Sequence, residues 1–115
     1  MEKLKKYRQI IQGLLTSHAT NNDPNIECQL LFDKEQDHYQ LLDLGWQGLT
    51  RVYAVYIHID IKGEKIWIQH NMTEYDIGKE LVEKGVPADD IILGLHPPYK
   101  RPYTNYGVAL SLIHI

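Results

Sequence analysis

The residues best suited to chemistry lie on the clearest strand pattern of the chain, the alternating run over residues 53–61. His58 and Asp60 are two positions apart in this run, so their side chains project from the same face of a strand. His70 ends the next predicted strand, and the three side chains could converge on a divalent metal. The spacings typical of zinc sites are absent, however, and polar side chains on an exposed sheet face explain the pattern. We therefore predict no metal ligand.

A second arrangement is nuclease-like. Asp43 on one predicted strand, followed by Asp60 and Lys62 on the next, matches a pattern in which two carboxylates hold Mg²⁺ and a lysine stabilises charge. Lys62 borders a tight turn, and no Pro-Asp pair precedes the pattern. A small metal-dependent enzyme using Asp43, His58 and Asp60 is therefore kept as an alternative.

Covalent catalysis lacks a nucleophile in this sequence. There is no G-x-S-x-G motif and no Gly-rich phosphate loop after a strand, and Ser17 and Ser111 lie near the chain ends. Cys28 is the single cysteine, and its place in the alternating run 26–30 indicates a buried, inert thiol in a reducing compartment. We predict no catalytic residue, no cofactor and no enzymatic activity.

The charge balance disfavours direct binding of DNA. Twelve Lys and Arg against 15 Asp and Glu give a net charge of -3, whereas proteins that contact phosphates usually concentrate basic residues on one surface. Lys3, Lys5, Lys6 and Arg8 form one basic cluster, and a DNA-binding module using these residues is the second alternative. No run approaches the ~18 apolar residues of a membrane span, so residues 1–115 are predicted to form one cytoplasmic domain.

Periodicity places these residues on an α+β fold. Apolar residues at helical spacing predict a helix from residue 2 to about 19. Strands are predicted over residues 26–32, 39–46, 53–61 and 65–69, as a four-stranded antiparallel meander. In the third strand, Tyr53, Val55, Ile57, Ile59 and Ile61 should face the core.

The turn between the third and fourth predicted strands contains Gly63. A type II′ turn over Gly63 and Glu64 would pair Ile61 with Ile66 and Ile59 with Ile68. A turn over Lys62 and Gly63 would move the cross-strand partners and keep the same faces.

A second helix should run from about residue 74 to 84. Thr73 is its predicted N-cap, Gly85 follows its end, and Ile77, Leu81 and Val82 form its buried stripe. Residues 86–93 should add a further helical turn. Three prolines in residues 96–102 then predict an extended tail.

Aromatic side chains suggest an interaction surface. Tyr56 and Trp67 are predicted on the sheet face opposite the isoleucines, with Trp46 near them, and large rings of this kind are favoured at interfaces. Either residues 99–115 cover this face, or it contacts a second copy in a dimer. Tyr99, Arg101 and Tyr103 in the tail offer further anchors for a partner.

Three segments carry a family resemblance: HIDIKGEKIWIQ at residues 58–69, TEYDIGKELVEKGVPADDI at residues 73–91 and LGLHPPYKR at residues 93–101. With the helix LKKYRQIIQGLL, they make the chain resemble the XisI family, the cyanobacterial fdxN element excision controlling factors. Members of that family often have Asp-Gly where this chain has Gly63 and Glu64.

The resemblance implies an accessory protein. Its expected role is control of site-specific excision of a DNA element during heterocyst differentiation, alongside a recombinase and a nuclease-like companion, XisH. It brings no catalytic residues to this chain. We therefore expect a non-enzymatic regulator that binds an XisH-like protein and copies of itself, and that reaches the recombinase and DNA only indirectly.

Overall fold

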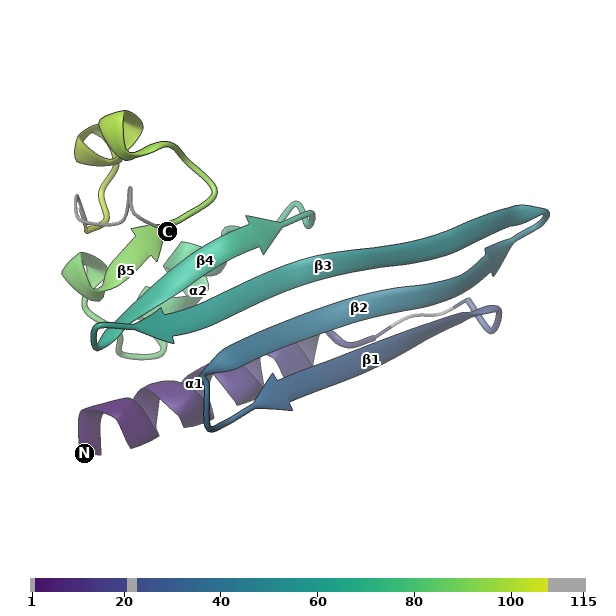
Figure 1. The fold of residues 1–115 in the computed structure, drawn as a ribbon, viewed down its shortest axis with the longest axis horizontal. Helices are drawn as coiled ribbons and strands as arrows, with labels where there is room; N and C mark the ends of the chain where they lie inside the picture. The colour runs from purple at the N-terminus through teal and green to yellow at the C-terminus, as the bar shows by residue number, and fades with distance from the viewer. Residues whose placement is uncertain (1, 21–22, 108–115) are drawn as a thin grey trace.

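The N-terminal helix and the first four strands occur in the predicted order. The structure is a computed structural model that describes residues 2–20 and 23–107. Helix α1 (Glu2–His18) is followed by β1 (Ile26–Asp33), β2 (His38–Gln47), β3 (Thr50–Lys62) and β4 (Lys65–Asn71). After them come α2 (Ile77–Glu83), the 3₁₀ helix η1 (Ala88–Asp90), β5 (Ile91–Leu93) and the 3₁₀ helix η2 (Pro98–Tyr103), as Figure 1 shows.

The five strands form one mixed sheet in the order β1-β2-β3-β4-β5. The first four are antiparallel neighbours as predicted, whereas β5 pairs in parallel with β4. The prediction of four strands is therefore corrected, because residues 91–93 form a strand and only Ala88–Asp90 makes a helical turn. Ile91 and Ile92 are both fully buried, and burial on both faces is typical of a parallel strand.

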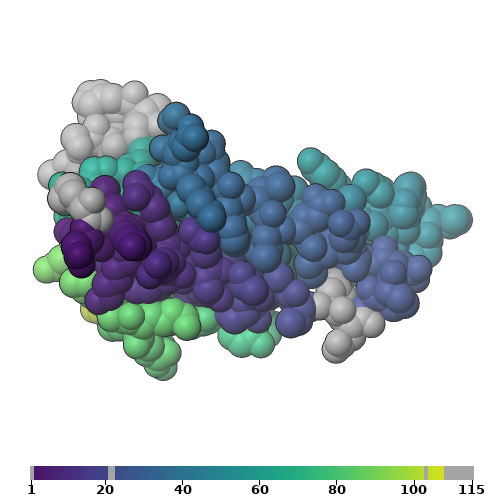
Figure 2. Space-filling model, turned by 90° about the horizontal axis from the view of Figure 1, so that it is seen from below, coloured from purple at the N-terminus to yellow at the C-terminus, as the bar shows by residue number. Residues whose placement is uncertain are grey.

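One face of the sheet forms the core with the two helices. Ile57, Ile59 and Ile61 of β3 pack with Ile66 and Ile68 of β4, as predicted. The buried residues of the helices complete this cluster: Tyr7, Ile11, Leu14 and Leu15 of α1, and Ile77 and Leu81 of α2. Figure 2 shows α1 in purple along one side of the sheet, with the tip of the β2–β3 hairpin projecting beyond it.

A β-bulge in β3 changes which residues share a face. Leu41 pairs with Ile57, but Leu42 pairs with Val55, so Tyr56 is an extra residue. Beyond the bulge the alternation is shifted by one, and Tyr53 and Val55 lie on the face opposite Ile57. The prediction that they belong to the core face is therefore wrong.

The β3–β4 turn keeps the predicted register but not the predicted type. Ile61 pairs with Ile66 and Ile59 with Ile68. Gly63 and Glu64 both have positive φ, 57° and 61°, so the turn belongs to type I′ and not to type II′. Type I′ matches the right-handed twist of two neighbouring strands. Glu64 therefore adopts a positive φ although it is not glycine.

Helix α2 begins three residues later than predicted. Asp76 is the N-cap, and its carboxylate accepts the backbone N–H of Lys79 at 3.0 Å. Thr73 instead forms a turn, donating its backbone N–H to Asn71 Oδ1 and accepting that of Tyr75. Val82, predicted in the buried stripe, is exposed.

The tail is helical where an extended chain was predicted. In η2 the N–H of Lys100 binds the carbonyl of Pro97, and the N–H of Thr104 binds that of Arg101. These separate i to i+3 bonds require no N–H from Pro98 or Pro102, so the prolines fit a 3₁₀ helix. The predicted tail residues 108–115 lie outside the described part of the chain.

Candidate functional site

The sheet face opposite α1, here called the open face, carries the most exposed aromatic side chains of the sheet. Tyr39 and Leu41 of β2 are buried in the core, so alternation places Trp46 on the open face. The cross-strand register adds Tyr53 from β3 and Leu31 from β1. Trp46 is 50% exposed and Tyr53 is 68% exposed.

The tip of the β2–β3 hairpin extends beyond α1 in Figure 1. Trp46, which pairs with Arg51, and Tyr53, which pairs with Leu44, lie near this tip. We call residues 44–53 the distal hairpin. The Arg51 guanidinium lies 5.4 Å from the Trp46 ring, which holds the ring in a cation–π contact. Leu49 at the tip is almost fully exposed. Exposed aromatic, aliphatic and arginine side chains in one place are typical of a protein interaction surface.

Trp67, predicted as an interface residue, is covered by the chain's own tail. Its exposure is 4%, and that of Arg101 is 5%. The Arg101 guanidinium lies 5.2 Å from the Trp67 ring, and Lys62 Nζ lies 5.1 Å from it. A Cβ on Gly94 would lie 3.1 Å from the edge of this ring, so glycine allows the tail to approach. Of the two alternatives for this face, cover by the chain's own tail or contact with a second copy, the first therefore holds for Trp67 in this structure, with Arg101 as a covering residue.

We expect Arg101→Ala to lower the melting temperature. The substitution removes a desolvated cation–π contact and the cover of Trp67, which together should cost about 2 kcal/mol of the free energy of unfolding. Lys100→Ala, on the exposed neighbour, is the matched control and should change little. Equal melting temperatures for wild type and Arg101→Ala would contradict this packing role. Arg101 would then remain a candidate for contact with a partner, as the sequence predicts.

The other predicted interface residues lie in separate places. Tyr56, the bulge residue, lines a hollow with Ser17 and His18 at the end of α1, and so does not share the open face with Trp67. Tyr99 is exposed on η2. Tyr103 belongs to η2, but its side chain lies outside the described part of the structure.

A cluster of polar side chains occupies the open face at the other end of β2 and β3. His38 Nδ1 and His58 Nε2 each lie 2.8 Å from the same oxygen, Oδ1 of Asp60. Gln69 Nε2 donates to the second oxygen, Oδ2, at 3.1 Å. Burial acts to raise the pKa of Asp60, but the hydrogen bonds from the imidazoles and the amide outweigh it, so this pKa is lowered.

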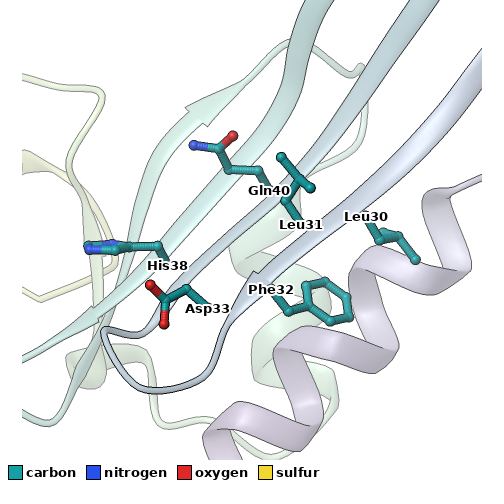
Figure 3. Close-up of a pocket in the computed structure, with 6 residues that line it drawn as sticks. All are labelled: Leu30, Leu31, Phe32, Asp33, His38 and Gln40. Carbon is teal, nitrogen blue, oxygen red and sulfur yellow. The ribbon is translucent and has the colours of Figure 1, made fainter.

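Sequence reasoning paired His58 and Asp60 correctly but missed His38. The signal for His38 was the β2–β3 hairpin, since its register places His38 directly opposite Asp60. His70, the third residue considered, pairs with His58 across the strands but lies outside the cluster. Figure 3 shows His38, Asp33 and Gln40 on one side of the sheet, with Leu30 and Phe32 directed toward α1.

The nuclease-like set does not assemble. Asp43 pairs with Ala54, six residues along β3 from Asp60. It is buried on the core side, where the half-buried Cys28 donates its thiol to Oδ1 at 3.1 Å. Lys62 lies against Trp67. The two carboxylates that would share Mg²⁺ are therefore on different faces and far apart along the sheet.

Comparisons with known proteins match almost the whole chain. The family model XisI, described as XisI protein, matches residues 1–108. A crystal structure of a XisI-like protein from Anabaena variabilis is similar with 51% identity and a TM-score of 0.88, covering 92% of this chain and 99% of its own. The fdxN element excision controlling factor XisI from Anabaena variabilis shares 35% identity and a TM-score of 0.81, with 93% and 99% covered. No curated protein matches the sequence.

Proposed function

This chain belongs to the XisI family, and we propose that it is a non-enzymatic accessory protein that controls site-specific excision of a DNA element through protein partners. The observation that carries the proposal is the 35% identity, over nearly its full length, to a protein known as an excision controlling factor. The process we infer is the excision that accompanies heterocyst differentiation in cyanobacteria.

The geometry supports action through partners. The open face and distal hairpin present Trp46, Tyr53 and Leu31 to solvent, which is the kind of surface that a partner protein covers. Asp43 and Asp60 are separated, which speaks against the nuclease alternative. Among the helices of residues 2–20 and 23–107, none combines the length and apolarity needed to cross a membrane.

The partners we propose are an XisH-like protein and a second copy of this chain. The recombinase and the DNA would then be reached through the XisH-like protein. This order is compatible with the net charge of -3, because a protein that contacts many phosphates directly needs a concentrated basic surface. We propose that the protein acts in the cytoplasm, where the recombination substrate is found.

Co-purification from the native host, followed by identification of the bound proteins, tests the proposal. We expect an XisH-like protein to be recovered with the tagged chain and not with the tag alone. The isolated chain should show no Mg²⁺-dependent cleavage of DNA that carries the element, and light scattering should show a dimer. DNA cleavage by the isolated chain would overturn the accessory role, and a monomer at micromolar concentration would contradict self-association.

A further inference from the structure

The cluster on β2 and β3 has the donor set of a transition-metal site. His38, His58 and Asp60 each offer one ligand atom, and these atoms all lie within 4.8 Å of one another. Two imidazoles with one carboxylate suit Zn²⁺ and related divalent ions, whereas Mg²⁺ prefers oxygen ligands alone. We infer that these three residues bind one Zn²⁺ on the open face.

The present distances are close to those that coordination requires. Zinc lies about 2.0–2.1 Å from imidazole nitrogen and about 2.0–2.2 Å from carboxylate oxygen, so neighbouring ligands of a tetrahedral ion are about 3.3 Å apart. The two imidazole nitrogens are each 2.8 Å from Asp60 Oδ1. Each imidazole nitrogen therefore needs to move roughly 0.5 Å away from Asp60 Oδ1, and the two nitrogens, now within 4.8 Å of one another, need to reach the same spacing. The His38 side chain is 53% exposed and free of core packing, so it can make this movement.

The surroundings provide the hydrogen bonds that metal ligands usually have. Gln69 holds the second oxygen of Asp60 and so orients the carboxylate. Gln40 Nε2 lies 3.5 Å from Nδ1 of His58, the nitrogen that would face away from the metal. In the metal-bound tautomer this Nδ1 carries the proton, and reversal of the Gln40 amide presents its oxygen as the acceptor.

The ion would sit at the surface with an open side. Asp60 is buried at the base of the cluster, while His38 forms its solvent side, next to the hollow lined by Asp33 and Gln40. Three protein ligands leave at least one position of a tetrahedral ion for water or for a side chain of a bound protein. The site is independent of the distal hairpin, which lies at the other end of the same strands.

Binding of Zn²⁺ to the untagged protein, measured by calorimetry and by the visible spectrum of Co²⁺ as a substitute, tests this inference. We expect one ion per chain, no displacement by Mg²⁺, and a melting temperature that falls when EDTA removes the ion. His38→Ala should abolish stoichiometric binding. Gln69→Ala, which only loosens the carboxylate, should weaken binding by about 10-fold.

His70→Ala is the matched control, since this imidazole is exposed on β4 beside the cluster but contributes no ligand. It should bind Zn²⁺ as tightly as the wild type. Because His38 is half-exposed, His38→Ala should keep the fold, and circular dichroism checks this. Absence of stoichiometric binding by the wild type, or equal binding by His38→Ala, would show that the cluster is only a hydrogen-bonded network.

Discussion

Ile57→Asp should prevent the chain from folding cooperatively. Ile57 is fully buried in the middle strand of the sheet, in the core cluster that also contains the buried residues of α1. The substitution removes a core aliphatic side chain and buries an unpaired carboxylate, each costing roughly 2 to 5 kcal/mol. Since a small domain is stable by about 5–15 kcal/mol in total, the sum is enough to unfold it. Thermal melting followed by circular dichroism measures the effect.

Tyr53→Asp is the control that also tests the bulge. Simple alternation puts Tyr53 on the same face as Ile57, whereas the bulge at Tyr56 puts it on the open face. An aspartate there remains solvated and should cost about 1 kcal/mol or less. If Tyr53→Asp unfolded the protein as completely as Ile57→Asp, the shifted alternation in β3 would be contradicted. His58→Ala should likewise be mild.

The strands and their partners could be predicted because their signals are local. Alternating isoleucines on β3 and β4 and a glycine at the turn between them define a register, and Ile61 does pair with Ile66. The helical spacing of α1 is equally local, and its predicted end agrees with the structure to within a residue. These elements needed no knowledge of how distant parts of the chain meet.

The bulge in β3 and the strand β5 depend on distant contacts. An extra residue such as Tyr56 leaves no mark on composition, because the residues on both sides still alternate and only the pairing with β2 shows the shift. Residues 91–93 are too short to be told from a helical turn by periodicity. They become a strand because β4 offers a free edge, which is a property of the assembled sheet.

The candidate sites were recognised in part for the same reason. His58 and Asp60 share a strand, so their spacing alone placed them together. His38 joins them only through the pairing of β2 with β3. Conversely, Trp67 and Arg101 were each sensible interface candidates from their residue types, and it is their contact with one another, across 34 residues of sequence, that removes both from the surface.

Replacing Trp46 and Tyr53 together by Ala should abolish binding of the proposed XisH-like partner. Large aromatic side chains at an interface commonly contribute 2 kcal/mol or more each, so we expect affinity to fall by more than about 100-fold. Both rings are exposed in the isolated chain, so the melting temperature should change little. Calorimetry with the purified partner, together with thermal melting of the variant, measures the two effects.

Tyr99→Ala is the matched comparison, because Tyr99 is 65% exposed, close to the 68% of Tyr53, but lies on η2. It should leave partner binding unchanged if the distal hairpin forms the interface. Loss of binding in Tyr99→Ala but not in the double variant would assign the interface to the tail instead. Because η2 also covers Trp67, a partner bound there would stabilise the packing of Arg101 on that ring, and Arg101→Ala would then weaken binding as well as lower the melting temperature.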